Sequence, residues 1–443
     1  MPIKTQIKDS YIKSEAAFVQ ASVKANDLVD FPKFILPLFY LFSAYLVLPI
    51  VDIPLLGLSI SAPLMFIITI PCIFKPARPW FRAYQKWIIL AILIWFGIVL
   101  STLLNGAFSF GTDIDNQGLL SVIQYAYWLL VFVITVYITS QGIVLGKISI
   151  VLGWSIFLLA LLRWGEYIFR GNAVGRTYFL TQNDYGFLFS SFSPFLLYQV
   201  FSQHGWKRFF AILGNLALWG AVAINGSRGS WVAIMFGLGL TLMLFFFRNP
   251  RKFAGLLIFL LLLVTIGILA WNLTPQISSV VQFRFESLLS LEEDKSALIR
   301  EAMVQKGISL FSGSPIIGVG SNRFRQETVV LNLPRTIAYL RQSEMNRTSA
   351  HNSYIQWLAE FGLVGSIPFA IFLLILITQG LKKSLNSLKD GGSLFLMIFI
   401  GFIQMSVHMW VISAITNSST WFIYGLLGGM VMSSRSESRE KCA

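Results

Sequence analysis

GSWVAIMFGLGLTLMLFFFRNPRKFAGLLIFLLLLVTIGILAWN, residues 229–272, contains two long apolar runs separated only by the basic sequence RNPRK. Each run approaches the roughly 20 residues that a helix needs to cross the hydrocarbon core of a bilayer. The stretch therefore predicts two membrane-spanning helices, at 229–247 and 253–272. Arg248, Arg251 and Lys252 lie in the turn between them and mark it as cytoplasmic, because membrane proteins concentrate Lys and Arg in cytoplasmic loops.

The composition of the whole chain has the same character. Of its 443 residues, 56% are hydrophobic and only 12% are charged, whereas soluble domains carry about 25% charged residues. A water-soluble core could not bury so much apolar surface, so lipid is the expected solvent. The net charge of +14 does not indicate nucleic acid as a partner, because cytoplasmic loops explain it. Cys72 and Cys442 are the only cysteines, which excludes a disulfide framework and a zinc site.

Apolar runs elsewhere predict ten further spans, and the chain is expected to be an all-α integral membrane protein with twelve transmembrane helices. Nine of the spans lie within 34–272 and three within 352–433, so 273–351 forms the one large loop. The ten further spans are residues 34–51, 54–74, 87–104, 119–139, 143–162, 184–202, 208–224, 352–378, 393–413 and 420–433.

The lysines orient this bundle. Fourteen of the sixteen lysines fall on one predicted side, together with the polar tail 1–33 and the basic tail 434–443. The opposite loops at 105–118 and 414–419 contain neither Lys nor Arg. Both tails are therefore predicted to be cytoplasmic, and the large loop 273–351 lies on the outer side. No short apolar core follows Met1, so the first tail does not read as a cleavable signal peptide.

Arginine is distributed differently, since eleven of the eighteen arginines lie on the predicted outer side. A guanidinium binds phosphate bidentately and is more weakly hydrated than an ammonium, so this bias favours a phosphate-binding role. Arg176 precedes the span 184–202, Arg228 lies in the glycine-flanked turn INGSRGSW, and Arg300 lies in the loop sequence SLEEDKSALIREAMVQKGISLFSG. That sequence predicts an amphipathic helix with Ser290 as its N-cap. The alternative is that exported loops tolerate positive charge, which there pairs with acidic residues.

His351 lies where the large loop meets the span 352–378, in the sequence TSAHNSYIQWLAEFGLVG at residues 348–365. A histidine near its ordinary pKa of about 6.5 exchanges a proton at neutral pH. Arginines and one histidine suit the displacement of a lipid diphosphate: the guanidiniums stabilise the leaving group and the imidazole is a general base for a sugar hydroxyl. The alternative is that His351 caps the helix, although Asn352 and Ser353 could do so unaided.

Three other polar features are assigned lesser roles. His204 is expected to be a solvated loop residue, and His408 to be packed or hydrogen-bonded near the outer end of its span. Asp113 and Asp115 form a D-x-D sequence of the kind that metal-using glycosyltransferases exploit, but a solvated loop is the preferred interpretation. No metal site or cofactor is predicted, because no His, Cys and carboxylate cluster has usable spacing.

Three stretches taken together resemble the O-antigen ligase and polymerase superfamily: SRGSW after a span, RFESLL followed by ALIREAMVQKGISLFSGSPIIGVGSNRF, and SAHNSYIQWLAEFGLVGSIPF. The resemblance covers roughly residues 170–380. Its most specific part is the His-Asn pair before the E-x-G-x-x-G sequence of Glu360, Gly362 and Gly365. The resemblance implies a GT-C-like glycosyltransferase architecture in the inner membrane of a Gram-negative bacterium, with a periplasmic active site.

It also implies an inverting, metal-independent transfer of a completed polysaccharide from undecaprenyl diphosphate to a sugar of lipid A–core. The chain would act among membrane lipids as a monomer or weak oligomer. By position in the motifs, the resemblance implies that His351 is the base and that Arg228 and Arg300 engage the diphosphate. Arg176 matches an arginine before the span 184–202 that is less fixed in the family, and it is expected to bind the diphosphate too. Ser227, Arg284 and Asn352 are expected to support them.

Other activities stay open. A related polymerase would use the same donor and take a second lipid-linked glycan as its acceptor. A protein O-glycan transferase of the same superfamily would need a pilin-like acceptor. The single large loop and the His-Asn signature favour a ligase. A twelve-span transporter is a different class, but its functional charges usually lie near the membrane midplane, whereas here they lie at outer helix ends.

Overall fold

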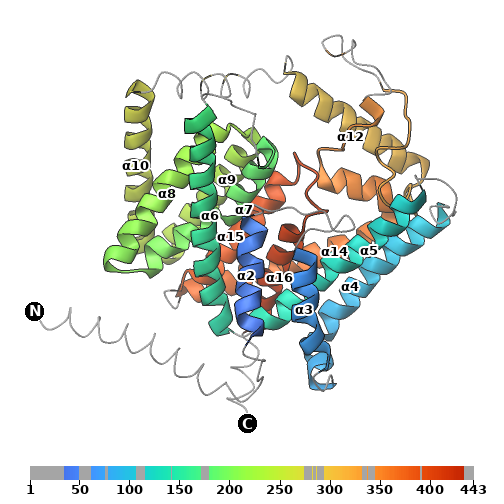
Figure 1. The fold of residues 1–443 in the computed structure, drawn as a ribbon, viewed down its shortest axis with the longest axis horizontal. Coiled ribbons are helices and arrows are strands. Elements are labelled where there is room, and N and C mark those ends of the chain that lie inside the picture. Colours follow the sequence, from blue (N-terminus) through green and yellow to red (C-terminus); the bar gives the residue numbers. More distant parts are fainter. Residues whose placement is uncertain are drawn as a thin grey trace, which may run out of the picture.

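The computed structural model describes residues 34–48, 61–74, 78–105, 115–140, 142–170, 179–273, 282, 286, 294–331, 337, 345–389 and 392–433. These residues form a bundle of helices (Figure 1), and each of the twelve predicted spans contains one helix. The helices of these spans are α2 (Ile35–Val47), α3 (Ser61–Phe74), α4 (Arg78–Leu104), α5 (Asp115–Thr139), α6 (Gly142–Arg170), α7 (Gln182–Ser202), α8 (Gly205–Asn225), α9 (Arg228–Arg248), α10 (Pro250–Leu273), α14 (Ser353–Lys389), α15 (Leu394–His408) and α16 (Ser418–Met432).

The helices α4, α5, α6, α8, α9, α10 and α14 contain seven segments that are long and apolar enough to cross a membrane. The helices α2 and α15 are apolar but shorter. The chain is therefore a multi-pass membrane protein. The full count of twelve spans stays a prediction, because length and composition qualify only seven of the described helices.

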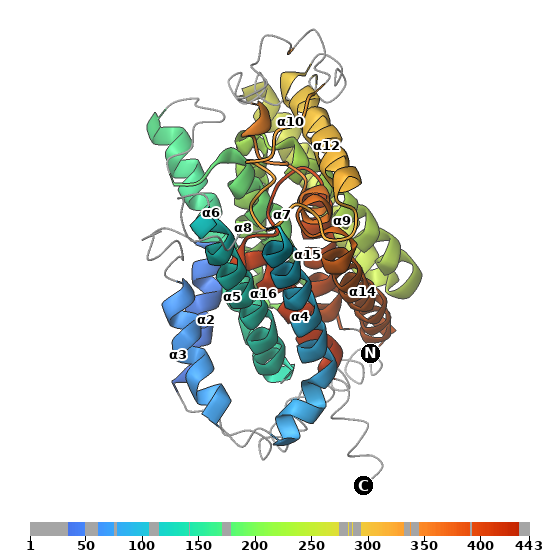
Figure 2. The ribbon, with the colours of Figure 1, turned by 90° about the vertical axis from the view of Figure 1, so that its right-hand side faces the viewer.

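The three C-terminal helices hold the bundle together. Helix α14 packs against α4, α16 packs against α5, and α15 packs against α7 and α9, so two groups of helices flank this centre (Figures 1 and 2). Aromatic rings fill the contact between α14 and α16. The ring centroids of Phe369 and Trp421 are 6.3 Å apart, and those of Phe372 and Tyr424 are 5.4 Å apart. Such pairs add to the free energy gained by burying their area.

The predicted loop helix exists as α12 (Lys295–Gly313), which packs on α14 at one end of the bundle (Figure 2). A small apolar cluster separate from the main core lies beneath it. The prediction that Ser290 caps this helix is wrong. The N-cap is Asp294, whose side chain accepts a hydrogen bond from the backbone N–H of Ala297 at 2.9 Å. The cluster consists of Ala302, Met303, Leu310, Phe324, Leu331, Met345, Ala350 and Ala359.

Helix α14 is broken at Gly362, which has φ 55° and ψ −157°. The segment 315–324 lies along the break: the backbone N–H of Gly320 donates to the Glu360 carbonyl at 2.9 Å, and that of Leu363 donates to the Pro315 carbonyl at 2.9 Å. A Cβ on Gly362 would come within 2.5 Å of backbone atoms of this segment, so only glycine fits. The E-x-G-x-x-G sequence is therefore the place where the backbone of α14 contacts the backbone of the segment 315–324, which follows α12.

Two helices differ in extent from the spans predicted for them. Helix α14 runs beyond the predicted span 352–378 to Lys389 and is broken at Gly362. Helix α15 ends at His408, before the end of the predicted span 393–413. The reason for the second is Ser353, whose backbone N–H donates to the Met409 carbonyl at 2.9 Å and whose Oγ donates to the Ile412 carbonyl at 2.7 Å. These bonds hold the chain after α15 in a turn against the start of α14.

These contacts define one end of the bundle, which we call the site end. It contains α12, the C-terminal ends of α4, α6, α8 and α15, and the N-terminal ends of α7, α9 and α14. Direct bonds join several of these ends. The Oγ of Ser101, near the end of α4, donates to the Glu360 carbonyl at 2.8 Å, and the backbone N–H of Ser353 reaches α15 as described above. The alternation of spans predicted from the sequence agrees with this grouping.

Candidate functional site

The turn between α8 and α9 presents the first arginine of the site. Gly226 ends α8 with φ 65°, a left-handed conformation that favours glycine, and its N–H donates to the carbonyls of Val222 and Ala223. Ser227 follows as the N-cap position of α9, and Arg228 is the first residue of that helix. The flanking glycine that the sequence suggested is thus needed to reverse the chain within two residues.

Arg228 binds Asp294 through both arms of its guanidinium. Nη1 donates to Oδ2 at 2.7 Å and Nη2 donates to Oδ1 at 2.9 Å. The two side chains are only 10% and 15% exposed, so solvent screens this pair less than a surface pair. Because Asp294 also caps α12, the pair fastens the start of the loop helix to the start of α9. A carboxylate here occupies the planar fork that would suit a phosphate.

Asp294 is held in its ionised form by this pairing. Burial acts to raise the pKa of its carboxyl group, but the hydrogen bond from Arg228, the backbone hydrogen bond from Ala297 and the charge of Arg228 outweigh it and lower the pKa. The carboxylate is therefore charged at neutral pH and competes with any anion for Arg228.

Arg300 lies on α12 in the same site. Burial, followed by the positive charge of Arg228, lowers the pKa of Arg300, while the charge of Asp294 raises it. Its Nε is buried and has no hydrogen-bond partner among the described residues. Arg300 therefore adds a second positive charge near the Arg228–Asp294 pair, and its Nε can still donate a hydrogen bond. This arrangement suits an anionic ligand larger than one carboxylate.

His351 is held in a strained backbone conformation beside these arginines. Its φ is 48°, which costs a residue other than glycine about 1–2 kcal/mol. Its neighbours hold it there. Ala350 is buried in the cluster beneath α12, and Asn352 is buried as the cap of α14. The Oδ1 of Asn352 accepts hydrogen bonds from the N–H groups of Tyr354 and Ile355, each at 3.1 Å. Asn352 therefore does the capping, which leaves the imidazole of His351 for another role.

The imidazole of His351 is half-buried, and its Nε2 lies 3.4 Å from the Oγ of Ser349. Burial lowers the pKa of His351, and the positive charges of Arg300 and Arg325 lower it further. The imidazole is therefore neutral at neutral pH, which is the form that accepts a proton. The charge of Arg300 thus acts on His351, and the charge of Arg228 acts on Arg300.

Of the other residues predicted to contribute, only some lie within the described residues. Arg176 and Arg284 lie outside the described residues, as does Asp113, and Asp115 is the first residue of α5. Ser227 is 3% exposed, and a Cβ on Gly186 of α7 would lie 2.6 Å from its Oγ. The turn that carries Arg228 therefore packs directly against α7.

The two remaining histidines follow their predictions. His204 is exposed at the start of α8, at the end of that helix opposite Asn225. His408 is 1% exposed and its Nδ1 lies 2.9 Å from the Oγ of Ser190, which confirms a buried, hydrogen-bonded role. A Cβ on Gly229 would lie 3.0 Å from the Nε2 of His408, so this imidazole contacts the first turn of α9.

Sequence reasoning missed two residues of the site. Asp294 belongs to the acidic run Glu292, Glu293 and Asp294, and only the fold selects which of the three caps α12 and pairs with Arg228. The known preference for Asp at N-caps was the available signal. Arg325 was counted only as one of the outer arginines, and its link to His351 depends on the path of the segment 315–331.

The comparison with known families fits this geometry. Residues 213–370 match the family described as O-antigen ligase, and this segment contains Arg228, Asp294, Arg300 and His351. A search of curated proteins found no match. The family match favours glycosyl transfer over the transporter alternative. The match at residues 213–370 supports a member of the O-antigen ligase and polymerase superfamily, a family of glycosyl-transferring enzymes whose substrates are lipid-linked glycans.

Proposed function

We propose that the protein is an O-antigen ligase that transfers a preassembled polysaccharide from undecaprenyl diphosphate to a sugar hydroxyl of lipid A–core. The observation that carries this proposal is that His351, Arg300 and the Arg228–Asp294 pair all lie at the site end of the bundle, where the buried Nε of Arg300 has no hydrogen-bond partner among the described residues. All three lie within the segment that matches the family. Phosphate chemistry and proton transfer are thereby available in one place.

In the proposed reaction, the acceptor hydroxyl attacks the anomeric carbon of the donor's first sugar. His351 takes the hydroxyl proton as the new carbon–oxygen bond forms, and the bond from that carbon to the diphosphate oxygen breaks. Undecaprenyl diphosphate leaves with the bonding electron pair, and the configuration at the carbon inverts. Arg228 and Arg300 stabilise the negative charge that grows on the leaving group, which is the role that a divalent cation has in metal-using enzymes.

His351 suits the base role because its lowered pKa keeps it neutral at neutral pH. A positioned general base contributes typically about 10²–10⁴-fold to the rate. Arg228 must exchange the carboxylate of Asp294 for the diphosphate, so donor binding would also loosen the start of α12. Asn352 and Ser227 support the site by holding the two turns that carry His351 and Arg228.

The proposal includes the location of the enzyme. The site end would face the periplasm at the inner membrane of a Gram-negative bacterium, with both termini in the cytoplasm and with the region 273–351 as the periplasmic loop. The distribution of lysine and arginine in the sequence supports this orientation. Helix α12 would cover the reacting groups and limit hydrolysis of the donor, which competes with transfer. We expect neither a cofactor nor a metal requirement, and Arg176 and Arg284 remain proposed contributors.

The experiment that tests the proposal supplies the purified protein with a lipid-diphosphate glycan and either lipid A–core or a second molecule of the same donor. Growth of lipid A–core supports ligase activity. Elongation of the lipid-linked glycan instead identifies a polymerase, and the absence of either product contradicts glycosyl transfer.

The variant His351→Ala should abolish transfer without reducing the amount of folded protein. His204→Ala is the matched control, because it removes the exposed histidine at the start of α8. Full activity of His351→Ala would remove this residue from the mechanism. Equal loss in both variants would show that the effect is not specific to the site.

A further inference from the structure

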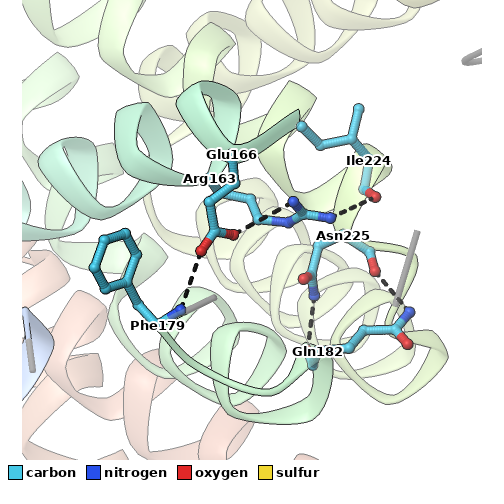
Figure 3. Close-up of polar contacts among 6 residues, drawn as sticks. All are labelled: Arg163, Glu166, Phe179, Gln182, Ile224 and Asn225. Carbon is cyan, nitrogen blue, oxygen red and sulfur yellow. Dashed lines mark hydrogen bonds and ion pairs between the residues drawn. The ribbon is translucent and has the colours of Figure 1, made fainter. Parts of the chain in front are cut away.

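A second set of buried polar groups lies next to the turn that carries Arg228 (Figure 3). Arg163 and Glu166, near the end of α6, are 1% and 9% exposed. Nη1 of Arg163 donates to Oε2 of Glu166 at 3.5 Å, and the Nε of Arg163 is buried with no partner among the described residues. Burying two charges in a membrane helix is costly, and such residues usually have a function.

The ion pair reaches beyond its own helix. Nη2 of Arg163 donates to the Ile224 carbonyl in the last turn of α8, at 3.5 Å. Oε1 of Glu166 accepts a hydrogen bond from the N–H of Phe179, just before α7, at 3.2 Å. Figure 3 shows Arg163 between Glu166 and Ile224. The pair therefore connects the end of α6 to the approach to α7 and to the end of α8.

A reciprocal amide pair completes this set. The Nε2 of Gln182, the first residue of α7, donates to the Asn225 carbonyl at 2.6 Å. The Nδ2 of Asn225, the last residue of α8, donates to the Gln182 carbonyl at 2.9 Å. Asn225 is fully buried, and its Oδ1 has no hydrogen-bond partner among the described residues. We call Arg163, Glu166, Gln182 and Asn225 the clasp.

The clasp is poorly explained as a device for stability. Its two bonds from Arg163 are at the long limit of hydrogen bonding, and two of its buried polar atoms lack partners. Apolar side chains of similar volume often stabilise a protein as well as a buried ion pair does. What the clasp does accomplish is placement, because two of its bonds hold consecutive carbonyls, those of Ile224 and Asn225.

These two carbonyls lie directly before Gly226, Ser227 and Arg228. We propose that the clasp residues Arg163, Glu166, Gln182 and Asn225 are positioning residues that fix the α8–α9 turn and so aim the guanidinium of Arg228 at the donor diphosphate. This inference rests on the proposed function, since it assigns the clasp to the donor side of that site. Displacing a binding group by about 1 Å can cost about 10²-fold in rate, so a fixed turn matters.

The clasp is expected to affect the binding site for the donor and not the site for the acceptor. The five hydrogen bonds given above join α6, α8 and the start of α7 and not the segment 345–352, so loss of the clasp should leave the proton transfer and the acceptor unaffected. A positioning role therefore predicts a change confined to the donor, in its binding and in the departure of its diphosphate. A purely structural role predicts general damage to activity.

The test uses Glu166→Gln, which keeps an acceptor for the Phe179 N–H but removes the charge that faces Arg163, and Asn225→Ala, which breaks the amide pair. Ser149→Ala is the control, because Ser149 is buried on the same helix α6 and its Oγ donates to the Leu145 carbonyl within that helix. Donor KM, acceptor KM and kcat are measured for the full-length protein in lipid nanodiscs. Hydrogen–deuterium exchange is followed in the peptide 222–231.

We expect each clasp variant to raise the donor KM about tenfold, the change that corresponds to losing roughly 1.4 kcal/mol of donor binding. The kcat should fall as well, because Arg228 also stabilises the leaving group, whereas the acceptor KM should stay within about twofold of the parent and exchange in 222–231 should increase. The control should match the parent in every measurement. If Glu166→Gln does not fold, Gln182→Ala replaces it, because it leaves the ion pair intact.

An unchanged exchange rate in 222–231, or an unchanged donor KM, overturns the inference. An acceptor KM that rises as much as the donor KM also overturns it, because that pattern marks a structural role. If the parent protein transfers no glycan, the proposed function fails. Exchange and the binding of undecaprenyl diphosphate, measured directly, then still decide whether the clasp orders the turn and strengthens diphosphate binding.

Discussion

Replacing Asp294 by Asn tests whether a carboxylate stands in for the donor diphosphate at Arg228. The substitution removes one negative charge but keeps the shape of the side chain. Asn is as good an N-cap as Asp, so α12 should keep its start. One oxygen remains to accept a hydrogen bond from Arg228, whereas the bidentate pair with contacts of 2.7 and 2.9 Å is lost.

The size of the effect follows from the burial of this pair. Hydrogen bonds that involve a charged group contribute about 1.5–3 kcal/mol each, and exposed ion pairs contribute about 0–1 kcal/mol. At 10% and 15% exposure, with one neutral acceptor retained, we expect the pair to lose about 1.5 kcal/mol. The free energy of unfolding should fall by about that amount. Because the diphosphate no longer has to displace a carboxylate, its dissociation constant should fall about tenfold.

The assay is direct binding of undecaprenyl diphosphate to the purified parent and to Asp294→Asn, with thermal unfolding measured in parallel. Asp294→Ala is the matched control, since it also removes the cap and should cost about 1 kcal/mol more in stability. Tighter binding together with lower stability is the expected result. Unchanged or weaker binding, with the stability loss as expected, would refute the view that Asp294 competes with the donor.

Four further outcomes are expected. The substitution Arg228→Lys should weaken diphosphate binding about 30-fold, because an ammonium cannot bind bidentately; near-normal affinity in a binding titration contradicts the clamp. The acid limb of the pH–activity profile should lie below about pH 6.5, since His351 is a base only when neutral and its pKa is lowered. Arg325→Gln should move that limb to higher pH, because it removes a positive charge that disfavours the imidazolium. An unmoved limb would show that the charge of Arg325 does not act on the pKa of His351. Gly362→Ala should destabilise the protein by about 2 kcal/mol or more in thermal unfolding, because φ is 55° and the new Cβ would meet backbone atoms. Gly239→Ala is the control and should not destabilise it, because there is open space around Gly239. Equal stabilities of the two variants would argue against the backbone contact. Activity should survive a chelator, and loss that Mg²⁺ or Mn²⁺ restores would favour the D-x-D motif as a metal site.

Much of the site was accessible from the sequence because its residues belong to short motifs. Glycine-flanked Arg228, Arg300 on an amphipathic helix and His351 beside a capping Asn each have a local signature, and the structure places them at one end of the bundle. The contribution of Arg176 and Arg284 stays a prediction. Asp294, Arg325 and the clasp had no such signature, because each acts through a contact with a residue far away in the chain.

Hydrophobic content by itself determined that this chain spans a membrane as helices, since roughly 20 consecutive apolar residues have few other stable states. Composition and periodicity are properties of one segment, so the helical state of that segment can be predicted without knowing what it packs against. Only the tertiary structure decided that Gly362 breaks α14, that Ser353 ends α15 early, and that one of three adjacent acids pairs with Arg228. Those outcomes depend on distances between segments, which no local pattern encodes.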